Sequence, residues 1–214
     1  MILYHGSENI IETPILGAGK KNNDYGQGFY CSKELELARE WACTENVSAY
    51  VNRYELDTTN LNVLYLSDEK YSVLHWLAIL VNYRRVRVTT PVMKRAIEWL
   101  IEHYFIDMDG YDMIVGYRAD DSYFSFARAF INNQISLGQL SYAMKLGELG
   151  MQYVLKSEKA FEKVSYIGFE TVDKTIYYAR RRRRDEEARV AFMKELETEE
   201  QNGVFIRDLM KAVK

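Results

Sequence analysis

Short apolar runs alternate along this chain with longer segments in which apolar residues recur every three or four positions. The runs are rich in β-branched and aromatic residues and predict strands, which lie at residues 2–5, 29–31, 48–56, 61–66, 111–115, 151–155 and 164–169. The periodic segments predict helices, which lie at residues 32–45, 72–83, 90–104, 122–132, 136–146, 157–161, 183–198 and 205–213. Strands at both ends of the core, with helices inserted between them, predict an α+β fold.

Residues with clear positional preferences set several of these boundaries. Ser32 is a good N-cap for the first helix, and Thr90 with a proline directly after it is a typical helix start. Ser136, with a glutamine three residues later, has the spacing of a capping box. We also expect Gly116 to end the strand at residues 111–115.

The length of 214 residues suits one sizeable domain with a helical extension. We expect a core domain over residues 1–170, with a helical insertion at about residues 68–106. A charged helical extension over residues 171–214 is expected to pack on this domain. Five consecutive arginines occupy residues 180–184, and three acids follow them at residues 185–187. This run predicts a solvated helix with intrahelical ion pairs, and the alternative is a patch that faces phosphate groups.

The charge, cysteine content and hydropathy of the chain indicate its cellular environment. A formal net charge of −3 provides no overall field that recruits nucleic acid. The two cysteines, Cys31 and Cys43, do not make a disulfide framework, and the N-terminus does not resemble a signal peptide. The longest apolar run, residues 73–81, contains a histidine and is too short to span a bilayer. We therefore expect a cytoplasmic protein with reduced cysteines and no membrane partner.

The first segment with candidate chemistry is His5-Gly6-Ser7, at the end of the first predicted strand. A histidine held there by main-chain bonds can donate to a ribose hydroxyl. Gly6 lets a ligand approach the backbone because it has no side chain to clash. The alternative is a histidine at a strand end that is satisfied by its own loop.

The second segment runs from Asp24 to Ser32 and has two glycines before an aromatic pair. A turn containing Gly26 and Gly28 can hold a flat ligand against Tyr30, and the alternative is a glycine-rich turn that only enters a strand. The segment is not a Walker loop, because no Gly-Lys-Ser/Thr follows. It also lacks the third glycine and the long preceding strand of a dinucleotide fingerprint.

Together, these segments resemble the NAD-binding half of ADP-ribosyltransferases, in the diphtheria-toxin and poly(ADP-ribose) polymerase branch with its His-Tyr-Glu triad. The resemblance implies a split β-sandwich with inserted helices, an NAD-binding domain at residues 1–170, and a cleft between two small sheets. It assigns the adenosine ribose to His5 and stacking on nicotinamide to Tyr30 and Trp41. The residues implied to bind NAD⁺ are His5, Gly6, Ser7, Gly28, Tyr30, Ser32 and Trp41.

More narrowly, the chain resembles the bacterial DUF3990 proteins. Their Asp-x-Gly-x-Gly-Phe-Tyr, Asp-x-Ile-x-Gly-x-x-Ala-Asp-Asp and Gln-Tyr-Val segments match residues 24–30, 112–121 and 152–154. Where the His-Tyr-Glu branch has its catalytic glutamate, this chain has Gln152. A neutral amide still accepts a hydrogen bond from the nicotinamide ribose but contributes no charge to an oxocarbenium-like transition state. Losing one such contact typically costs about 10²–10³ in rate.

Four further residues are candidates for auxiliary roles. Glu148 lies four residues before Gln152, where the family positions its acceptor-recognition loop. Asp120 or Asp121 can deprotonate an acceptor, and helix capping is the alternative for Asp120. Arg118 can pair with a pyrophosphate, unless it is an ordinary exposed arginine. Two adjacent acids without a nearby histidine give little support for a metal, so none is expected.

The resemblance implies a mono-ADP-ribosyltransferase with NAD⁺ as its substrate and a protein or nucleic acid as acceptor. Gln152 keeps two alternatives open: an inactive module that binds NAD⁺ or ADP-ribose, and an NAD⁺ glycohydrolase whose acceptor is water. The resemblance also suggests a toxin or defence effector, with a cognate antitoxin as a further partner.

Overall fold

Two β-sheets form the centre of the structure, a computed structural model that describes residues 1–45, 47, 49–119, 121–146, 150–197 and 203–212. The first sheet is antiparallel, with the strand order β1 (Ile2–Ser7), β3 (Ala49–Leu56) and β7 (Val164–Val172). The second sheet has the order β2 (Phe29–Cys31), β6 (Met151–Leu155), β5 (Met113–Tyr117) and β4 (Val63–Tyr65). Within it β4 and β5 run parallel, and the other pairs are antiparallel. Two sheets with helices between their strands agree with the predicted α+β class.

An apolar cluster fills the space between the two sheets. Its members from the strands are at most 8% exposed, and they are Leu3, Phe29, Cys31, Tyr54, Leu56, Met113, Val115 and Leu155. Successive strand residues point to opposite faces, so Ile114 and Val154 belong to the other face of the second sheet. That face packs against the helices and contributes to a larger core. The two sheets therefore pack on each other through these apolar side chains.

Two main-chain hydrogen bonds also join the sheets at the end of β2. The Tyr4 N–H donates to the Ser32 carbonyl and the Ser32 N–H donates to the Tyr4 carbonyl, both at 2.8 Å. This bridge brings β1, which carries His5, beside β2, which carries Tyr30. The first two segments singled out in the sequence are thus neighbours in the fold.

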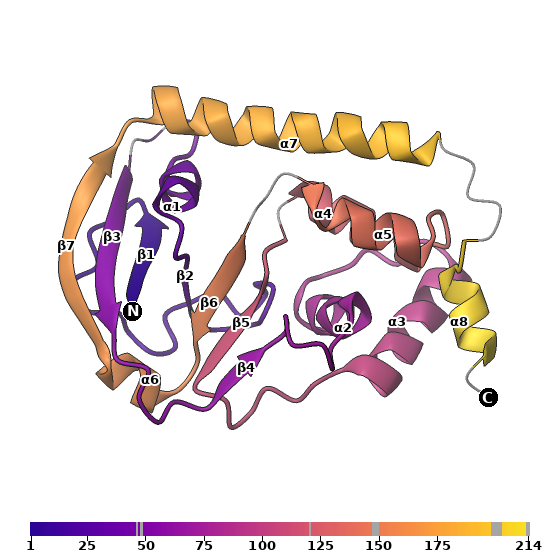
Figure 1. Cartoon of the computed structure of the whole chain (residues 1–214), viewed down its shortest axis with the longest axis horizontal. Coiled ribbons are helices and arrows are strands. Elements are labelled where there is room, and N and C mark those ends of the chain that lie inside the picture. Colours follow the sequence, from indigo (N-terminus) through magenta and orange to yellow (C-terminus); the bar gives the residue numbers. More distant parts are fainter. Residues whose placement is uncertain (46, 48, 120, 147–149, 198–202, 213–214) are drawn as a thin grey trace.

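Eight helices lie within the described residues. They are α1 (Leu35–Ala42), α2 (Val73–Tyr83), α3 (Pro91–Tyr104), α4 (Asp121–Ile131), α5 (Leu137–Ala143), α6 (Glu158–Glu162), α7 (Lys174–Leu196) and α8 (Ile206–Ala212). The predicted insertion at residues 68–106 corresponds to α2 and α3, which follow β4 and precede β5 (Figure 1). Of the helices described, none combines the length and the apolar character needed to cross a membrane.

Two predicted caps are present and one is absent. Thr90 Oγ1 accepts from the Met93 N–H, and Ser136 forms a capping box with the glutamine three residues later. The prediction that Ser32 caps the first helix is wrong, because α1 begins later, at Leu35. The main chain of Ser32 is held by the bridge to β1, and its Oγ accepts from the Glu34 N–H at 3.0 Å.

Gly116 lies within β5 instead of ending the strand, so that prediction is also wrong. A Cβ at this position would come within 2.8 Å of Tyr25 Cζ and 2.9 Å of Leu66 Cδ1. The glycine therefore allows the buried Tyr25 ring to lie directly against the strand. The Tyr25 hydroxyl donates to the Tyr117 carbonyl at 2.5 Å, which fixes the turn before β2 onto β5.

Helix α7 spans 23 residues and begins nine positions earlier than the predicted helix at 183–198. Its first half has few apolar residues, which explains why periodicity does not reveal it. Asp173 is its N-cap, and its carboxylate accepts from the Thr175 N–H at 2.8 Å. Figure 1 shows α7 running along one side of the molecule, from the first sheet past α1 to α4 and α5.

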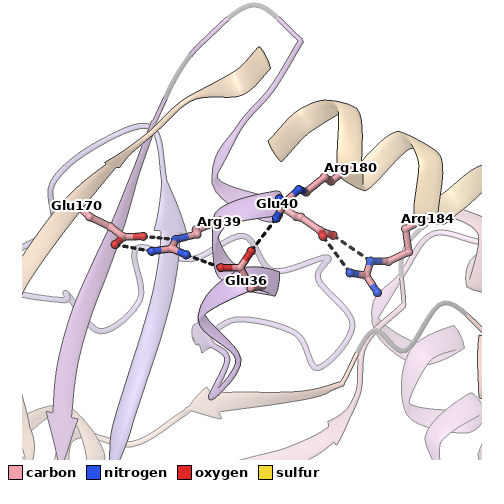
Figure 2. A network of polar contacts seen from close by, with 6 residues as sticks. All are labelled: Glu36, Arg39, Glu40, Glu170, Arg180 and Arg184. Carbon is pink, nitrogen blue, oxygen red and sulfur yellow. Dashed lines mark hydrogen bonds and ion pairs between the residues drawn. The ribbon is translucent and has the colours of Figure 1, made fainter. Parts of the chain in front are cut away.

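The arginine run holds α7 against α1 (Figure 2). Arg184 binds Glu40 with two hydrogen bonds of 2.9 Å, and Arg180 binds Glu36 at 2.9 Å. Glu36 also binds Arg39, which reaches Glu170 on β7. The prediction of intrahelical pairs holds for Arg183 and Glu187, 3.9 Å apart. It did not anticipate that Arg180 and Arg184 form ion pairs with α1, a helix that is distant in the sequence.

Candidate functional site

A cavity of about 740 Å³ lies where the ends of β1, β2 and β6 approach α1. Eight of the residues predicted to form the site line it, and they are His5, Gly6, Gly28, Tyr30, Ser32, Trp41, Arg118 and Gln152. They come from segments that are up to 147 residues apart in the sequence, counting from His5 to Gln152. The structure therefore gathers most of the predicted site around one space.

Four predicted residues are not placed in this cavity. Ser7 ends β1 and does not line the cavity; its Oγ accepts from the Asn9 N–H at 3.1 Å. Asp120 and Glu148 lie outside the described residues, and Asp121 begins α4 without a described side chain. The proposed auxiliary roles of these three acids remain predictions.

His5 is fixed by the main chain of β2. Its Nδ1 lies 2.6 Å from the Tyr30 carbonyl oxygen, and its ring lies against Phe29 with centroids 4.5 Å apart. A carbonyl only accepts, so Nδ1 carries the proton and Nε2 of the neutral ring is an acceptor. Burial lowers the pKa of His5 from its ordinary value of 6.5; the hydrogen bond to Tyr30 opposes this shift, and the positive charge of Arg118 adds to it. The neutral ring therefore offers a ligand an acceptor at Nε2, whereas the sequence-based expectation was a donor; the ribose contact itself stays a prediction.

Tyr30 uses its hydroxyl to close the glycine-rich turn. The hydroxyl donates to the Gly26 carbonyl at 2.5 Å and accepts from the Tyr25 N–H at 3.0 Å. Burial raises the pKa of Tyr30 well above its ordinary value. Because the hydroxyl is occupied by the turn and stays protonated, the part of Tyr30 suited to a ligand is the face of its ring.

Trp41 lies in the cavity wall under two guanidinium groups. The Arg118 guanidinium lies 3.4 Å from the indole centroid, and that of Arg181 on α7 lies 4.1 Å from it. Both are cation–π contacts. A nicotinamide ring that stacks on a covered face of Trp41 has to displace a guanidinium. The sequence predicted the aromatic ring but not its arginine partners.

Gln152 is buried in the cavity wall beside a carboxylate. Its Nε2 donates to Asp24 Oδ2 at 2.9 Å, and Asp24 is only 6% exposed. Asp24 also accepts from the Ala119 N–H at 3.0 Å and forms an ion pair with Arg84 at 3.1 Å. Sequence reasoning missed Asp24 and Arg84 as site residues. The position of Asp24 at the start of the glycine motif is a usable signal, whereas no local pattern marks Arg84.

The face of the second sheet explains how Tyr30 and Gln152 come together. Tyr30 pairs with Val154 across β2 and β6, so both side chains lie on the same face of the sheet. Gln152 lies two residues before Val154 and therefore shares this face. The cavity is bounded by this face at Tyr30 and Gln152, and by β1 of the first sheet at His5 and Gly6.

The glycines of the site allow the protein's own segments to approach closely. A Cβ on Gly6 would meet the backbone of α1, including the Ala38 carbonyl oxygen and, at 2.7 Å, the Ala42 nitrogen. A Cβ on Gly28 would lie 2.6 Å from Val154 Cγ1. Gly6 was expected to admit a ligand to the backbone; the structure shows that the missing side chain admits α1.

A comparison with protein families matches the part of the chain that forms this cavity. A model described as a protein of unknown function (DUF3990) matches residues 1–166. The chain belongs to the DUF3990 family. No curated protein and no solved structure matches it. The matched segment includes every described residue that lines the cavity, whereas α7 and α8 lie beyond it.

The part of the chain with described side chains contains no group of three or more His, Cys, Asp or Glu residues suited to a metal ion. Cys31 and Cys43 are both buried and not joined to each other. Burial raises the pKa of each thiol above its ordinary value, so neither is activated as a thiolate. The polar groups of the cavity include the imidazole, amide, carboxylate and guanidinium groups described above, together with the side chains of Lys20, Asn22 and Asn23.

Proposed function

We propose that this DUF3990 protein binds NAD⁺ in the cavity and transfers its ADP-ribose to an acceptor. The observation that carries the proposal is that His5, Tyr30 and Gln152, from three different strands, line one cavity. The volume of about 740 Å³ falls within the range of roughly 300–1,000 Å³ that is usual for sites of small molecules and cofactors.

The described contacts support a specific orientation for NAD⁺. His5 Nε2 accepts from a hydroxyl of the adenosine ribose, because Nδ1 is used by the Tyr30 carbonyl. The Tyr30 ring supports the nicotinamide, and Gln152 Oε1 accepts from a hydroxyl of the nicotinamide ribose. Arg118 is a cavity-lining cation that can bind the pyrophosphate.

The transfer step breaks the bond between the ribose C1′ and the nicotinamide nitrogen. The bonding electrons go to that nitrogen, which neutralises the pyridinium, while positive charge develops over C1′ and the ring oxygen. A lone pair of the acceptor then forms the new bond to C1′, and the acceptor's proton passes to water. Orientation within the cavity lowers the entropic part of this barrier.

Gln152 also favours a second candidate, a module that binds NAD⁺ without turnover. Its amide is neutral, and it stands where the His-Tyr-Glu branch of ADP-ribosyltransferases has a glutamate. Binding requires only hydrogen bonds and stacking, which the amide and Tyr30 can supply. Catalysis additionally requires stabilisation of the developing positive charge.

The test uses NAD⁺ labelled in its ADP-ribose, a cell lysate as the source of acceptors, and chromatography of free nicotinamide. We expect label transfer by the wild-type chain and a sharp loss in Tyr30→Ala. Tyr166→Ala is the matched control, because this partly buried tyrosine packs near Tyr54 and does not line the cavity. Equal transfer by the wild type and Tyr30→Ala contradicts the site. Nicotinamide release without transfer indicates a glycohydrolase, and binding without release indicates the module.

A further inference from the structure

Asp24 is a buried carboxylate in the cavity wall, with three donors around it. Its Oδ1 accepts a hydrogen bond from Arg84 Nη1. Its Oδ2 accepts hydrogen bonds from the Ala119 N–H and from Gln152 Nε2. The Asp24 side chain is 8% exposed, so the cost of burying it is offset by these contacts. These contacts fix the position of the carboxylate inside the site.

The contact with Asp24 determines which way the Gln152 amide points. An ionised carboxylate only accepts hydrogen bonds, so the Gln152 atom that faces Asp24 is the NH₂ group. The amide oxygen, Oε1, is then directed away from Asp24. In the described part of the chain no group donates to Oε1. Gln152 thus retains one acceptor for a ligand hydroxyl.

We propose that Asp24 and Gln152 together perform the task of a single catalytic glutamate, with the charge on Asp24 and the ribose contact on Gln152. This inference rests on the proposed function. A hydrogen bond from an amide N–H to a carboxylate polarises the amide group. This polarisation makes the amide oxygen a stronger hydrogen-bond acceptor. Asp24 acts through Gln152 and is therefore a positioning residue, whose charge is transmitted to the ribose through the amide.

The same geometry changes the expectation for Gln152→Glu. Restoring a glutamate places two carboxylates at the position of the 2.9 Å contact between Gln152 and Asp24. Two carboxylates at that separation share a proton near neutral pH, and the pair then ionises in two steps. The rate of nicotinamide release by Gln152→Glu will therefore show an ionisation that is missing from the wild type.

Moving the negative charge from residue 24 to residue 152 tests whether Asp24 supplies the charge and Gln152 the ribose contact. In the double variant Asp24→Asn/Gln152→Glu, the asparagine NH₂ can donate to the new carboxylate, so the site again has one charge and one amide. We expect Asp24→Asn to lower the rate of nicotinamide release by about 10²–10³, as for loss of one preorganised electrostatic contact. The double variant recovers most of this rate and lacks the added ionisation of Gln152→Glu.

The matched control is Asp112→Asn, which changes another buried aspartate with similar contacts. Asp112 accepts from the Asn62 N–H at 2.7 Å and pairs with Lys159 at 3.2 Å, but it does not line the cavity. If Asp112→Asn and Asp24→Asn unfold at comparable temperatures and only Asp24→Asn loses turnover, the loss comes from the missing charge in the site and not from reduced stability. If Asp24→Asn does not fold, the pH profile of Gln152→Glu still decides the matter.

Four outcomes overturn the inference. The first is that Asp24→Asn releases nicotinamide at the wild-type rate. The second is that the double variant is no faster than Asp24→Asn, and the third is that the pH profile of Gln152→Glu shows no added ionisation. The fourth outcome is a wild type that releases no nicotinamide, because a competent Asp24–Gln152 pair must turn over. The first three leave the proposed function intact, provided that the wild type is active. If the wild type binds NAD⁺ without releasing nicotinamide, the binding module replaces the transferase; if the folded wild type binds no NAD⁺, the proposed function itself fails.

Discussion

The ion pair between Glu40 and Arg184 provides a quantitative test of how α7 is attached to the core. Glu40 is 3% exposed and receives two hydrogen bonds of 2.9 Å from Arg184, whose side chain is 29% exposed. Removing one partner from a fully buried pair costs about 3–5 kcal/mol. Partial exposure of Arg184 and the acceptor retained in Glu40→Gln reduce the cost to roughly 1–3 kcal/mol.

Chemical and thermal unfolding of Glu40→Gln measure this cost directly. At ~3 °C per kcal/mol for a chain of this size, the midpoint should fall by about 3–9 °C. The control is Glu187→Gln, because Glu187 is 73% exposed and lies 3.9 Å from Arg183 on the same helix. An exposed pair of this kind should change the free energy of unfolding by less than about 0.5 kcal/mol.

A double-mutant cycle with Arg184→Met isolates the interaction from other effects of each substitution. The coupling energy should account for most of the loss seen in Glu40→Gln. A coupling near zero, or equal losses in Glu40→Gln and Glu187→Gln, would refute the reasoning that this contact holds α7 to α1.

Two further predictions follow from the site. Burial lowers the pKa of His5 and of His75 from 6.5, so the unfolded chain binds more protons and the free energy of unfolding should fall as the pH drops below about 6.5. His5→Gln should make this fall smaller in denaturation curves from pH 7 to 5, and an unchanged slope would contradict the assigned shift. Gly6→Ala should lower the free energy of unfolding by about 1–3 kcal/mol, because its Cβ meets the backbone of α1. An unchanged urea midpoint would show that β1 and α1 adjust without cost.

Local patterns in the sequence predicted most of the secondary structure. Thr90 and Ser136 cap the helices they were expected to cap, since a cap depends on residues within one turn. The bounds of β2 and β6 follow from short apolar runs between glycines and polar residues, whereas β1 continues two residues past its predicted end, to Ser7. Ser32 failed as a cap because a contact with a distant strand, β1, determines its conformation.

The arrangement within the site was predictable only in part. The motifs indicated His5, Tyr30, Trp41 and Gln152, and the structure places all four around one cavity. Their partners depend on pairings across the fold that have no local signature. The contact of Asp24 with Gln152 joins residues 128 positions apart.

The same limit applies to the C-terminal helix. The arginine run predicted a charged helix, and its charge pattern favoured pairs within that helix. Arg180, Arg181 and Arg184 each contact a residue of α1, and the α1 partner of Arg181 is the cavity residue Trp41. The helix that follows the family match therefore contacts a residue of the proposed site.

Calorimetric titration of NAD⁺ into the wild-type chain and into Tyr30→Ala tests the central claim most directly. The proposed site predicts one NAD⁺ per wild-type chain and a large loss of affinity in Tyr30→Ala, with Tyr166→Ala binding as the wild type does. An absence of NAD⁺ binding by the folded wild-type chain would contradict the account.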